Sequence, residues 1–385
     1  MLTVHENYYE EMPDWNLVKL LPSELRIEKV NAFKNGKFRM IGDIGIRAFF
    51  QLYKRAKQII QSEKIDFLYI PIPSFYCALL GRWLHQSTGI KYGIDYIDPW
   101  VHHFPGSDQL FSRHWFSTKL AGMLEPVAVK KASLITGVAA GYYTAVAERN
   151  PGLKTTTVFG AMPYGGEQGD YDLLKQLDTQ PYLFKKTNKR ILVYAGAMLP
   201  KAFVTLDSIF KSIQAAPGVF AEIEFHFIGT GKTADDQGGF NIKPLAKKYG
   251  LWQTIVFEYP RRISYMDVLV HLNAADGIFI FGSTESHYTP SKVYQGILSN
   301  KPVLAVLHQQ STAVQVLKKS GAGLVLGFNG EGDVDSIEQQ FPSIVQQFIE
   351  WLQNFDPANI HKEIFEMYSA KNITKQLAAL LDKVV

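Results

Sequence analysis

The sequence contains one cysteine, Cys77, so no disulfide can form within the chain, and this is typical of a reducing compartment. No apolar run approaches the roughly 18 residues that a membrane-spanning helix needs. The first residues lack the charged segment and the long apolar stretch of a signal peptide. A net charge of +4 is too mild for a nucleic-acid-binding surface. We therefore expect a cytoplasmic globular protein that does not bind nucleic acid.

A chain of 385 residues, 46% apolar and 20% charged, suits a soluble protein with two domains of roughly 150–200 residues each. Short apolar runs alternate with helical patterns, which indicates βαβ units and parallel sheets. Strands are expected at residues 67–70, 92–95, 134–138, 190–196, 223–228, 255–257, 277–281, 302–306 and 323–326, with helices near 45–62, 74–87 and 109–132.

Residues 161–189 lose this periodicity and collect glycine and proline. We therefore predict a first domain over 1–165, a linker over 166–189 and a second domain over 190–367. Both domains are expected to be doubly wound and Rossmann-like, and to face a common cleft where ligands bind at the carboxyl ends of the strands.

The beginning of the chain departs from this pattern. A doubly wound domain opens with a strand and a glycine-containing turn into a helix, whereas the irregular, aromatic stretch at Tyr8 and Tyr9 follows residues 2–4 directly. The first βα unit is expected to be missing, which predicts a truncated or misassigned start.

The segment 283–305 is unusually polar and follows a predicted strand. Pro290 is expected at the first position of a helix, with Thr289 as its N-cap. The backbone amides of Ser291 and Lys292 would then form an anion site, to which the lysine adds a full charge. A plain strand–loop–helix connection is the alternative.

Other ligand motifs are missing. The sequence has no dinucleotide fingerprint at the start of either predicted domain, and His226 stands where a Walker A motif needs glycine. Acidic pairs such as Asp333 and Asp335 do not end a predicted strand. We predict no metal and no cofactor.

The segment 283–305 resembles the donor site of family 4-type glycosyltransferases, which have the GT-B fold. In that family a helix opens with a Ser-Lys pair, matched here by Ser291 and Lys292, and carries a glutamate that binds the ribose hydroxyls, matched by Gln295. His287 stands at the family's other glutamate, and Glu285 would reach that role through a two-residue shift. The resemblance implies donor contacts from this segment, Tyr288 and Thr289 included.

Further segments agree in order. Gly196 resembles the glycine turn after the first donor-domain strand, with Ala197 in place of the family's arginine and Lys201 supplying its lysine. Residues 256–262 resemble the base-binding loop. Arg261 or Arg262 would compensate for the missing arginine, and an ordinary solvated arginine is the alternative.

In the first half, residues 94–100 resemble the family's strand-end motif. The carboxylate of Asp98 would hold an acceptor hydroxyl or stabilise positive charge on the donor sugar, and His102 follows closely. A loop in which Asp98 accepts backbone amides before Pro99 is the alternative. The resemblance also implies that a final helix over 368–385 crosses back onto the first domain.

The implied function is transfer of a sugar from a nucleotide diphosphate-sugar to a sugar, lipid-linked or polysaccharide acceptor. The reaction would retain configuration without metal, in bacterial-type glycan or glycolipid synthesis. The alternatives are a non-catalytic GT-B nucleotide-binding or partner protein, and an epimerase- or hydrolase-like relative. Around Trp115, with Lys119, Lys130 and Lys131, the sequence is compatible with peripheral contact at the inner membrane face or with a plain amphipathic helix.

Overall fold

The structure, a computed structural model, describes residues 1–9, 14–18, 21–34, 42–101, 107, 109–176, 179–231, 238–286 and 288–385. The chain forms two compact units. The first comprises Met1–Pro13, Leu20–Pro163 and Ile373–Val385, and the second comprises Asp14–Lys19 and Tyr164–Asn372. Of the helices in these described ranges, none has the length and apolar character that crossing a bilayer requires.

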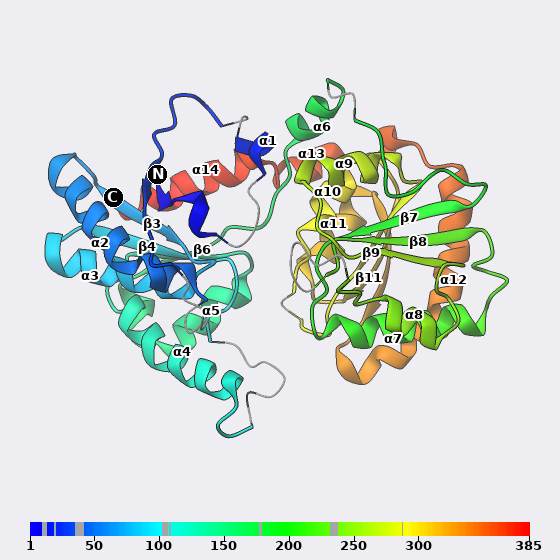
Figure 1. The fold of residues 1–385 in the computed structure, drawn as a ribbon, viewed down its shortest axis with the longest axis horizontal. Coiled ribbons are helices and arrows are strands. Elements are labelled where there is room, and N and C mark those ends of the chain that lie inside the picture. Colours follow the sequence, from blue (N-terminus) through cyan, green and yellow to red (C-terminus); the bar gives the residue numbers. More distant parts are fainter. Residues whose placement is uncertain are drawn as a thin grey trace. The chain divides into compact units, whose positions relative to one another are not determined.

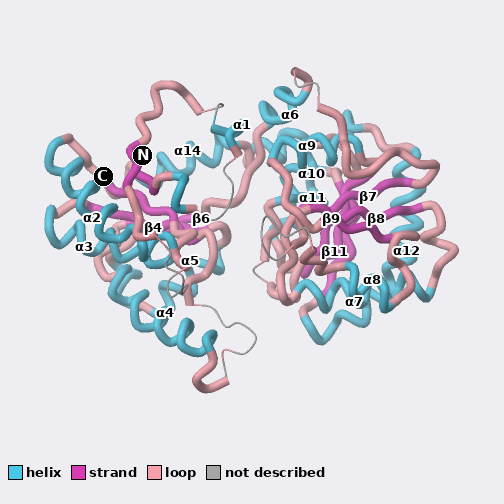
Figure 2. Tube along the Cα trace, viewed as in Figure 1, coloured by secondary structure: helices cyan, strands magenta, loops and turns pink. Residues whose placement is uncertain are grey.

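The second unit is built on a parallel six-stranded sheet in the order β12-β11-β10-β7-β8-β9 (Figures 1 and 2). Its strands are mostly apolar runs, largely buried except along the two edge strands, as expected where helices cover both faces of a parallel sheet. They are β7 (Arg190–Ala195), β8 (Ile223–Ile228), β9 (Val256–Tyr259), β10 (Gly277–Phe281), β11 (Val303–His308) and β12 (Gly323–Phe328).

Helices cover both faces of this sheet. One core, with Phe210 and Phe348 among its members, packs α7 (Ala202–Ala215), α8 (Lys243–Lys248) and α12 (Val334–Gln353) on one face. The other core, with Leu269 and Ile297, packs α9 (Tyr265–Ala274), α10 (Lys292–Leu298) and α11 (Thr312–Ser320) on the opposite face. The sheet is therefore doubly wound. The unit also holds α1 (Trp15–Val18), α6 (Gln168–Leu174) and α13 (Lys362–Glu366).

The first unit carries a parallel four-stranded sheet, β3 (Phe67–Pro71), β4 (Lys91–Tyr96), β5 (Leu134–Gly137) and β6 (Val158–Ala161), in sequence order. Its helices are α2 (Ile44–Ser62), α3 (Ala78–Thr88), α4 (Arg113–Val129) and α5 (Ala140–Arg149). Asp43 caps α2 by accepting a hydrogen bond from the N–H of Ile46, and Gly89 ends α3 with a φ of 78°. The final helix α14 (Ala370–Leu381) lies in this unit from Ile373 onward, and Leu380 covers Gly160 of β6.

The first strand, expected to be missing together with the rest of the first βα unit, is present in a two-stranded sheet of its own. Residues Leu2–Val4 form β1, which pairs in parallel with β2 (Glu28–Val30), and the N–H of His5 donates to Val30. The strand was overlooked because it is only three residues long and no glycine turn follows it in the sequence.

Residues 166–189, expected as a linker, belong to the second unit. Tyr171 and Phe184 are buried in its core, and the Tyr171 hydroxyl donates to the backbone carbonyl of Gln295. The glycines and prolines of this stretch interrupt its periodicity without preventing two aromatic anchors from packing.

Candidate donor site

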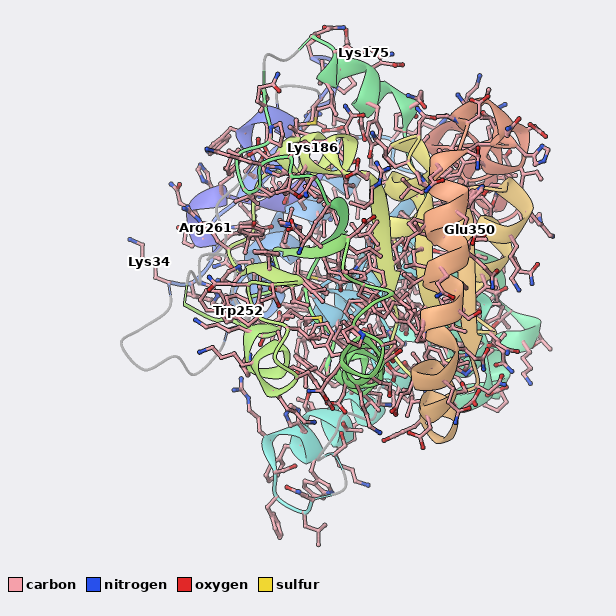
Figure 3. All side chains as sticks on the ribbon, turned by 90° about the vertical axis from the view of Figure 1, so that its right-hand side faces the viewer. Lys34, Lys175, Lys186, Trp252, Arg261 and Glu350 are labelled. Carbon is pink, nitrogen blue, oxygen red and sulfur yellow. The ribbon has the colours of Figure 1, made fainter. Side chains whose placement is uncertain are left out.

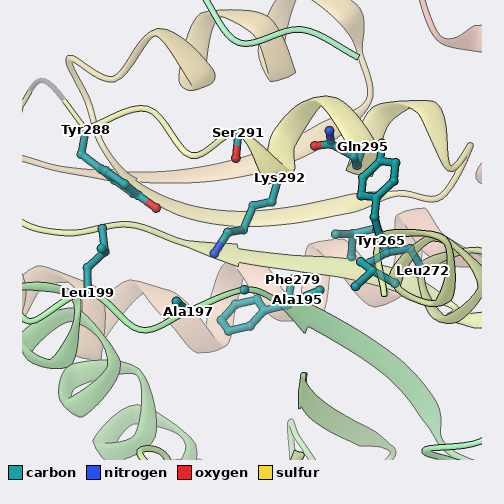
Figure 4. Close-up of a pocket in the computed structure, with 13 residues that line it drawn as sticks. Ala195, Ala197, Leu199, Tyr265, Leu272, Phe279, Tyr288, Ser291, Lys292 and Gln295 are labelled. Carbon is teal, nitrogen blue, oxygen red and sulfur yellow. The ribbon is translucent and has the colours of Figure 1, made fainter. Parts of the chain in front are cut away.

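A cavity of about 340 Å³ opens where the winding of the second sheet reverses. Strands β7 and β10 are neighbours there, although 81 residues lie between Ala195 at the end of β7 and Gly277 at the start of β10. From β7 the sheet continues to β8 on one side, and from β10 it continues to β11 on the other side. Ligands of doubly wound folds bind at such a switch point, outside the carboxyl ends of the strands. The cavity is lined by Ala195, Gly196, Ala197, Leu199, Tyr265, Val268, Leu272, Ile278, Phe279, Tyr288, Ser291, Lys292 and Gln295 (Figure 4).

Lys292 is the one ionisable cation among the residues that line this cavity. Its side chain descends from the start of α10 toward Ala197 (Figure 4), and its Nζ lies 3.7 Å from the centre of the Tyr194 ring. The aromatic face offsets a small part of the lost hydration. In the described part of the chain, no carboxylate pairs with this ammonium and no acceptor receives a hydrogen bond from it. Desolvation by burial therefore lowers the pKa of Lys292 to about 7.

Gly196 makes room for this lysine. The residue directly follows β7 with a φ of 144°, and a Cβ at this position would lie 2.9 Å from Lys292 Nζ. Both the backbone conformation and the close approach favour glycine here. The glycine turn that the sequence singled out is thus the floor beneath the buried ammonium.

The start of α10 differs from the expectation. The helix begins at Lys292 with Ser291 at the capping position, and Thr289 is not the N-cap. The buried Thr289 hydroxyl instead pairs with Thr312 at 2.8 Å, because the segment from Tyr288 is tied to the start of α11, where Ser311 donates to the Tyr288 carbonyl. This cross-link fixes the loop that presents Ser291 and Lys292.

Lys201 and Glu285 neutralise each other. Their charged atoms lie 3.0 Å apart, and the Ser283 hydroxyl lies within 3.5 Å of the same carboxylate. Both residues were predicted at the donor site, Lys201 in place of the lysine that the resemblance implies and Glu285 in place of its glutamate. The structure brings them together as an ion pair beside the cavity, and neither lines it.

Gln295 contacts an aromatic neighbour that the sequence did not single out. Its side chain hydrogen-bonds Tyr265, whose hydroxyl also donates to Asp170 at 2.8 Å. Burial raises the pKa of Tyr265 well above its ordinary value. Tyr265 and Tyr194 were missed because a tyrosine among apolar neighbours has the same sequence pattern as an ordinary core residue.

The remaining predicted contacts lie around or outside the cavity. Arg261 and Arg262 are exposed (Figure 3 shows Arg261 at the surface), and Arg262 packs 3.8 Å from where a Cβ on Gly229 would lie. Neither arginine lines the cavity. His287 lies outside the described residues.

In the first unit, Asp98 is exposed just after β4. His102 lies outside the described residues. The half-buried carboxylate of this region is Asp95, which accepts a hydrogen bond of 2.6 Å from the Thr136 hydroxyl, and Tyr69 pairs with Thr136 at 2.9 Å. Burial raises the pKa of Asp95. Asp95 belongs to β4 and lies half-buried in the sheet, whereas Asp98 follows the end of the strand and is exposed.

Among the described residues, no group of three or more histidine, cysteine, aspartate or glutamate side chains has an arrangement that could hold a metal ion. Glu258, in the predicted base-binding loop, has a structural role. It accepts hydrogen bonds from the Thr230 hydroxyl and from the N–H groups of Asn241, Ile242 and Lys243, and thereby fixes the start of α8 to the end of β9.

Two parallel-sheet units, one of them doubly wound with a cavity at its switch point, define a GT-B fold, and comparison with solved structures agrees. The chain is similar to a UDP-forming α,α-trehalose-phosphate synthase from Burkholderia xenovorans, with a TM-score of 0.59, 14% identity and coverage of 88% of this chain and 80% of that one. HepE of Anabaena, in complex with UDP, gives a TM-score of 0.60 at 13% identity, covering 93% and 86%.

The N-terminal domain of trehalose-6-phosphate phosphatase from Candida albicans gives a TM-score of 0.63 at 14% identity, covering 94% and 84%. No model of a protein family matches the sequence, and no curated protein matches it. The structural similarity establishes the GT-B fold.

Proposed function

We propose that this protein is a glycosyltransferase that binds a nucleoside diphosphate-sugar in the cavity of its second unit. The observation that carries the proposal is the ammonium of Lys292, enclosed at the switch point without a counter-ion in the described structure. A diphosphate is the kind of ligand that would supply the missing negative charge. HepE, one of the structures with this fold, has been solved with UDP and with UDP-glucose.

The first step of the reaction would be charge neutralisation. Lys292 and the backbone amides of Ser291 and Lys292 would face the diphosphate, the role that a metal plays in other transferases. The bond between the anomeric carbon and the diphosphate oxygen would break, and a new bond to the acceptor oxygen would form. The acceptor proton would leave with the nucleoside diphosphate. The family-4 resemblance implies retention of configuration.

Residues beside the cavity have supporting parts in this proposal. Gln295 would hold the ribose hydroxyls while Tyr265 fixes its side chain. The ion pair between Lys201 and Glu285 would open or shift as the diphosphate competes for the lysine. Asp98, exposed in the first unit, would serve the acceptor.

A non-catalytic nucleotide-binding protein is the second candidate, and two observations favour it. Glutamine stands at the family's ribose glutamate, and the available carboxylate, Glu285, is paired with Lys201. Incubation with UDP-glucose and a set of sugar acceptors separates the two functions. A glycosylated product supports transfer, UDP with free glucose supports hydrolysis, and UDP binding without turnover supports the non-catalytic function.

Binding itself is tested by a thermal-shift series with UDP, GDP, ADP, CMP and dTDP. A nucleotide at 100 times its dissociation constant stabilises the protein by about 2.7 kcal/mol, which is readily measured. A flat response to every nucleotide would contradict the proposed function.

A further inference from the structure

Helix α4 of the first unit has an exposed apolar stripe. Phe116, Leu120, Met123 and Val127 recur at intervals of four, three and four residues, so they share one face of the helix. All four are exposed, Met123 by 71% and Phe116 by 55%. We name these four residues the α4 stripe.

The opposite side of α4 makes the contacts with the rest of the unit. Its buried residues are Ala121, Glu125, Ala128 and Val129, all in the second half of the helix. The first two turns bury none, and they extend away from the sheet of this unit (Figure 1). Among the described residues of the first unit, none covers the face of α4 that carries the stripe.

The residues just before α4 enlarge the apolar surface. Leu110 is 71% exposed and Phe111 is 77% exposed, and the Phe111 ring lies 5.8 Å from that of Trp115. Phe111 has a φ of 63°, a left-handed conformation that costs a phenylalanine about 1 kcal/mol or more. The strained backbone thus holds the large Phe111 side chain in solvent, where it contributes nothing to the apolar core of the first unit.

Basic residues border the stripe on both sides. At 100° per residue, Arg113 falls along one edge and Lys119 along the other, and the exposed Lys130 and Lys131 follow at the end of the helix. Glu125 is the one acidic residue between 109 and 131, and it is buried in a bidentate pair with Arg149 at 2.8 and 2.9 Å. The exposed side of α4 therefore carries only positive charge around an apolar centre.

We propose that the α4 stripe and its basic border dock on an anionic lipid bilayer. The apolar side chains would enter the boundary between headgroups and acyl chains, while the bordering lysines extend their charged ends to the headgroups. Apolar burial and electrostatic attraction would act together, as stable peripheral binding requires. The charge complementarity favours a bilayer over a protein partner, which would need acidic groups placed to match. The inference is independent of the proposed donor site.

The test is flotation of the full chain with vesicles of pure phosphatidylcholine and with vesicles containing 30% phosphatidylglycerol. We expect binding to the anionic vesicles that weakens as salt is raised. Each basic residue near such a surface contributes about a fivefold change in affinity, so Lys119→Gln/Lys130→Gln should reduce binding roughly 25-fold. Phe116→Ser/Met123→Ser should reduce it at least about 10-fold.

Matched controls lie in the second unit. Lys318→Gln/Lys319→Gln removes two exposed adjacent lysines at the end of α11, and Met367→Ser removes a 53% exposed methionine. Both should bind vesicles as the unmodified chain does. Since all the α4 side chains involved are exposed, their variants should keep the melting temperature and the UDP affinity, which separates failure of docking from failure of the donor site.

Three results would overturn the proposal. One is absence of binding to anionic vesicles, and another is equal binding by the α4 and control variants. The third is a concentration-dependent dimer, seen by light scattering without lipid and dissociated by Phe116→Ser/Met123→Ser. That dimer would mean that a second copy of the chain covers the stripe.

Discussion

Replacing Lys292 by alanine should weaken UDP binding about 10- to 150-fold. A phosphate about 4 Å from the ammonium gains roughly 4 kcal/mol at an effective dielectric constant of 20. Because the pKa of Lys292 is about 7, half of the molecules are protonated at pH 7, and charging the rest costs about 0.4 kcal/mol. Desolvation of the phosphate offsets part of the gain and leaves roughly 1.5–3 kcal/mol, the usual contribution of a hydrogen bond to a charged group.

Replacing Lys292 should weaken UDP binding but should also stabilise the folded protein. Burial lowers the pKa of Lys292 from 10.5 to about 7, which corresponds to a destabilisation of the folded state by roughly 4–5 kcal/mol. This value is an upper bound, because the side chain keeps some contact with solvent. The unfolded chain holds this proton more tightly than the folded one. The destabilisation is therefore complete below pH 7 and disappears as the pH approaches 10.5. Lys292→Met, which keeps the shape of the side chain, should raise the melting temperature by several degrees at pH 6 and progressively less toward pH 10.

Calorimetric titration of UDP, paired with thermal melts, tests both effects. Lys301→Ala is the matched control, because Lys301 is a half-buried lysine of the same unit whose pKa is also lowered by burial, yet it lies outside the cavity. It should bind UDP with unchanged affinity. If Lys292→Ala is folded and binds UDP like the unmodified protein, the nucleotide binds elsewhere and the donor-site assignment fails.

Four further outcomes are expected. The affinity for UDP-glucose should fall by up to tenfold per pH unit as the pH rises from 7 to 9, because binding protonates Lys292 and the diphosphate of UDP-glucose does not titrate near neutrality. Calorimetry should show a much weaker pH dependence for Lys292→Arg, because the arginine stays charged. Gly196→Ala should weaken UDP binding at least about tenfold, since its Cβ displaces Lys292 Nζ, whereas Gly218→Ala, with open space around its Cβ, should not. Turnover of UDP-glucose should persist in EDTA, and loss of turnover restored by magnesium or manganese would contradict this. Glu258→Ala should destabilise the second unit by at least about 3 kcal/mol in urea, because it leaves three backbone N–H groups without their acceptor, while Glu222→Ala on the surface should have little effect.

Local patterns were sufficient to predict the framework of the fold. Runs such as residues 277–281 are apolar at every position because helices cover both faces of the sheet, and this signal lies entirely within the run. The polar segment around Lys292 could likewise be predicted as the beginning of a helix after a strand. The first residue of that helix could not be predicted, because the Thr289 hydroxyl, expected to cap the helix, instead hydrogen-bonds Thr312, 23 residues away.

Pairings between distant segments were the features that the sequence could not reveal. Lys201 and Glu285 are 84 residues apart, and each has the spacing of an independent donor-site residue. Residues Asp14–Lys19 belong to the second unit, and there the Asp14 carboxylate accepts the backbone N–H of Tyr265, 251 residues away. No periodicity within either segment encodes such a contact.

The cavity gives a physical meaning to Ala197, which stands where the donor site that the sequence resembles has an arginine. An arginine at this position would stand in the same wall as Lys292, toward which that lysine points (Figure 4), and two cations would repel each other there before any ligand arrived. With alanine, the cavity carries a single cation, whose pKa near 7 leaves it partly neutral when empty and allows an anion to charge it fully. The site is therefore least stable when empty and gains most from a diphosphate. In the proposed donor site, proton uptake by Lys292 and binding of a diphosphate would therefore be coupled.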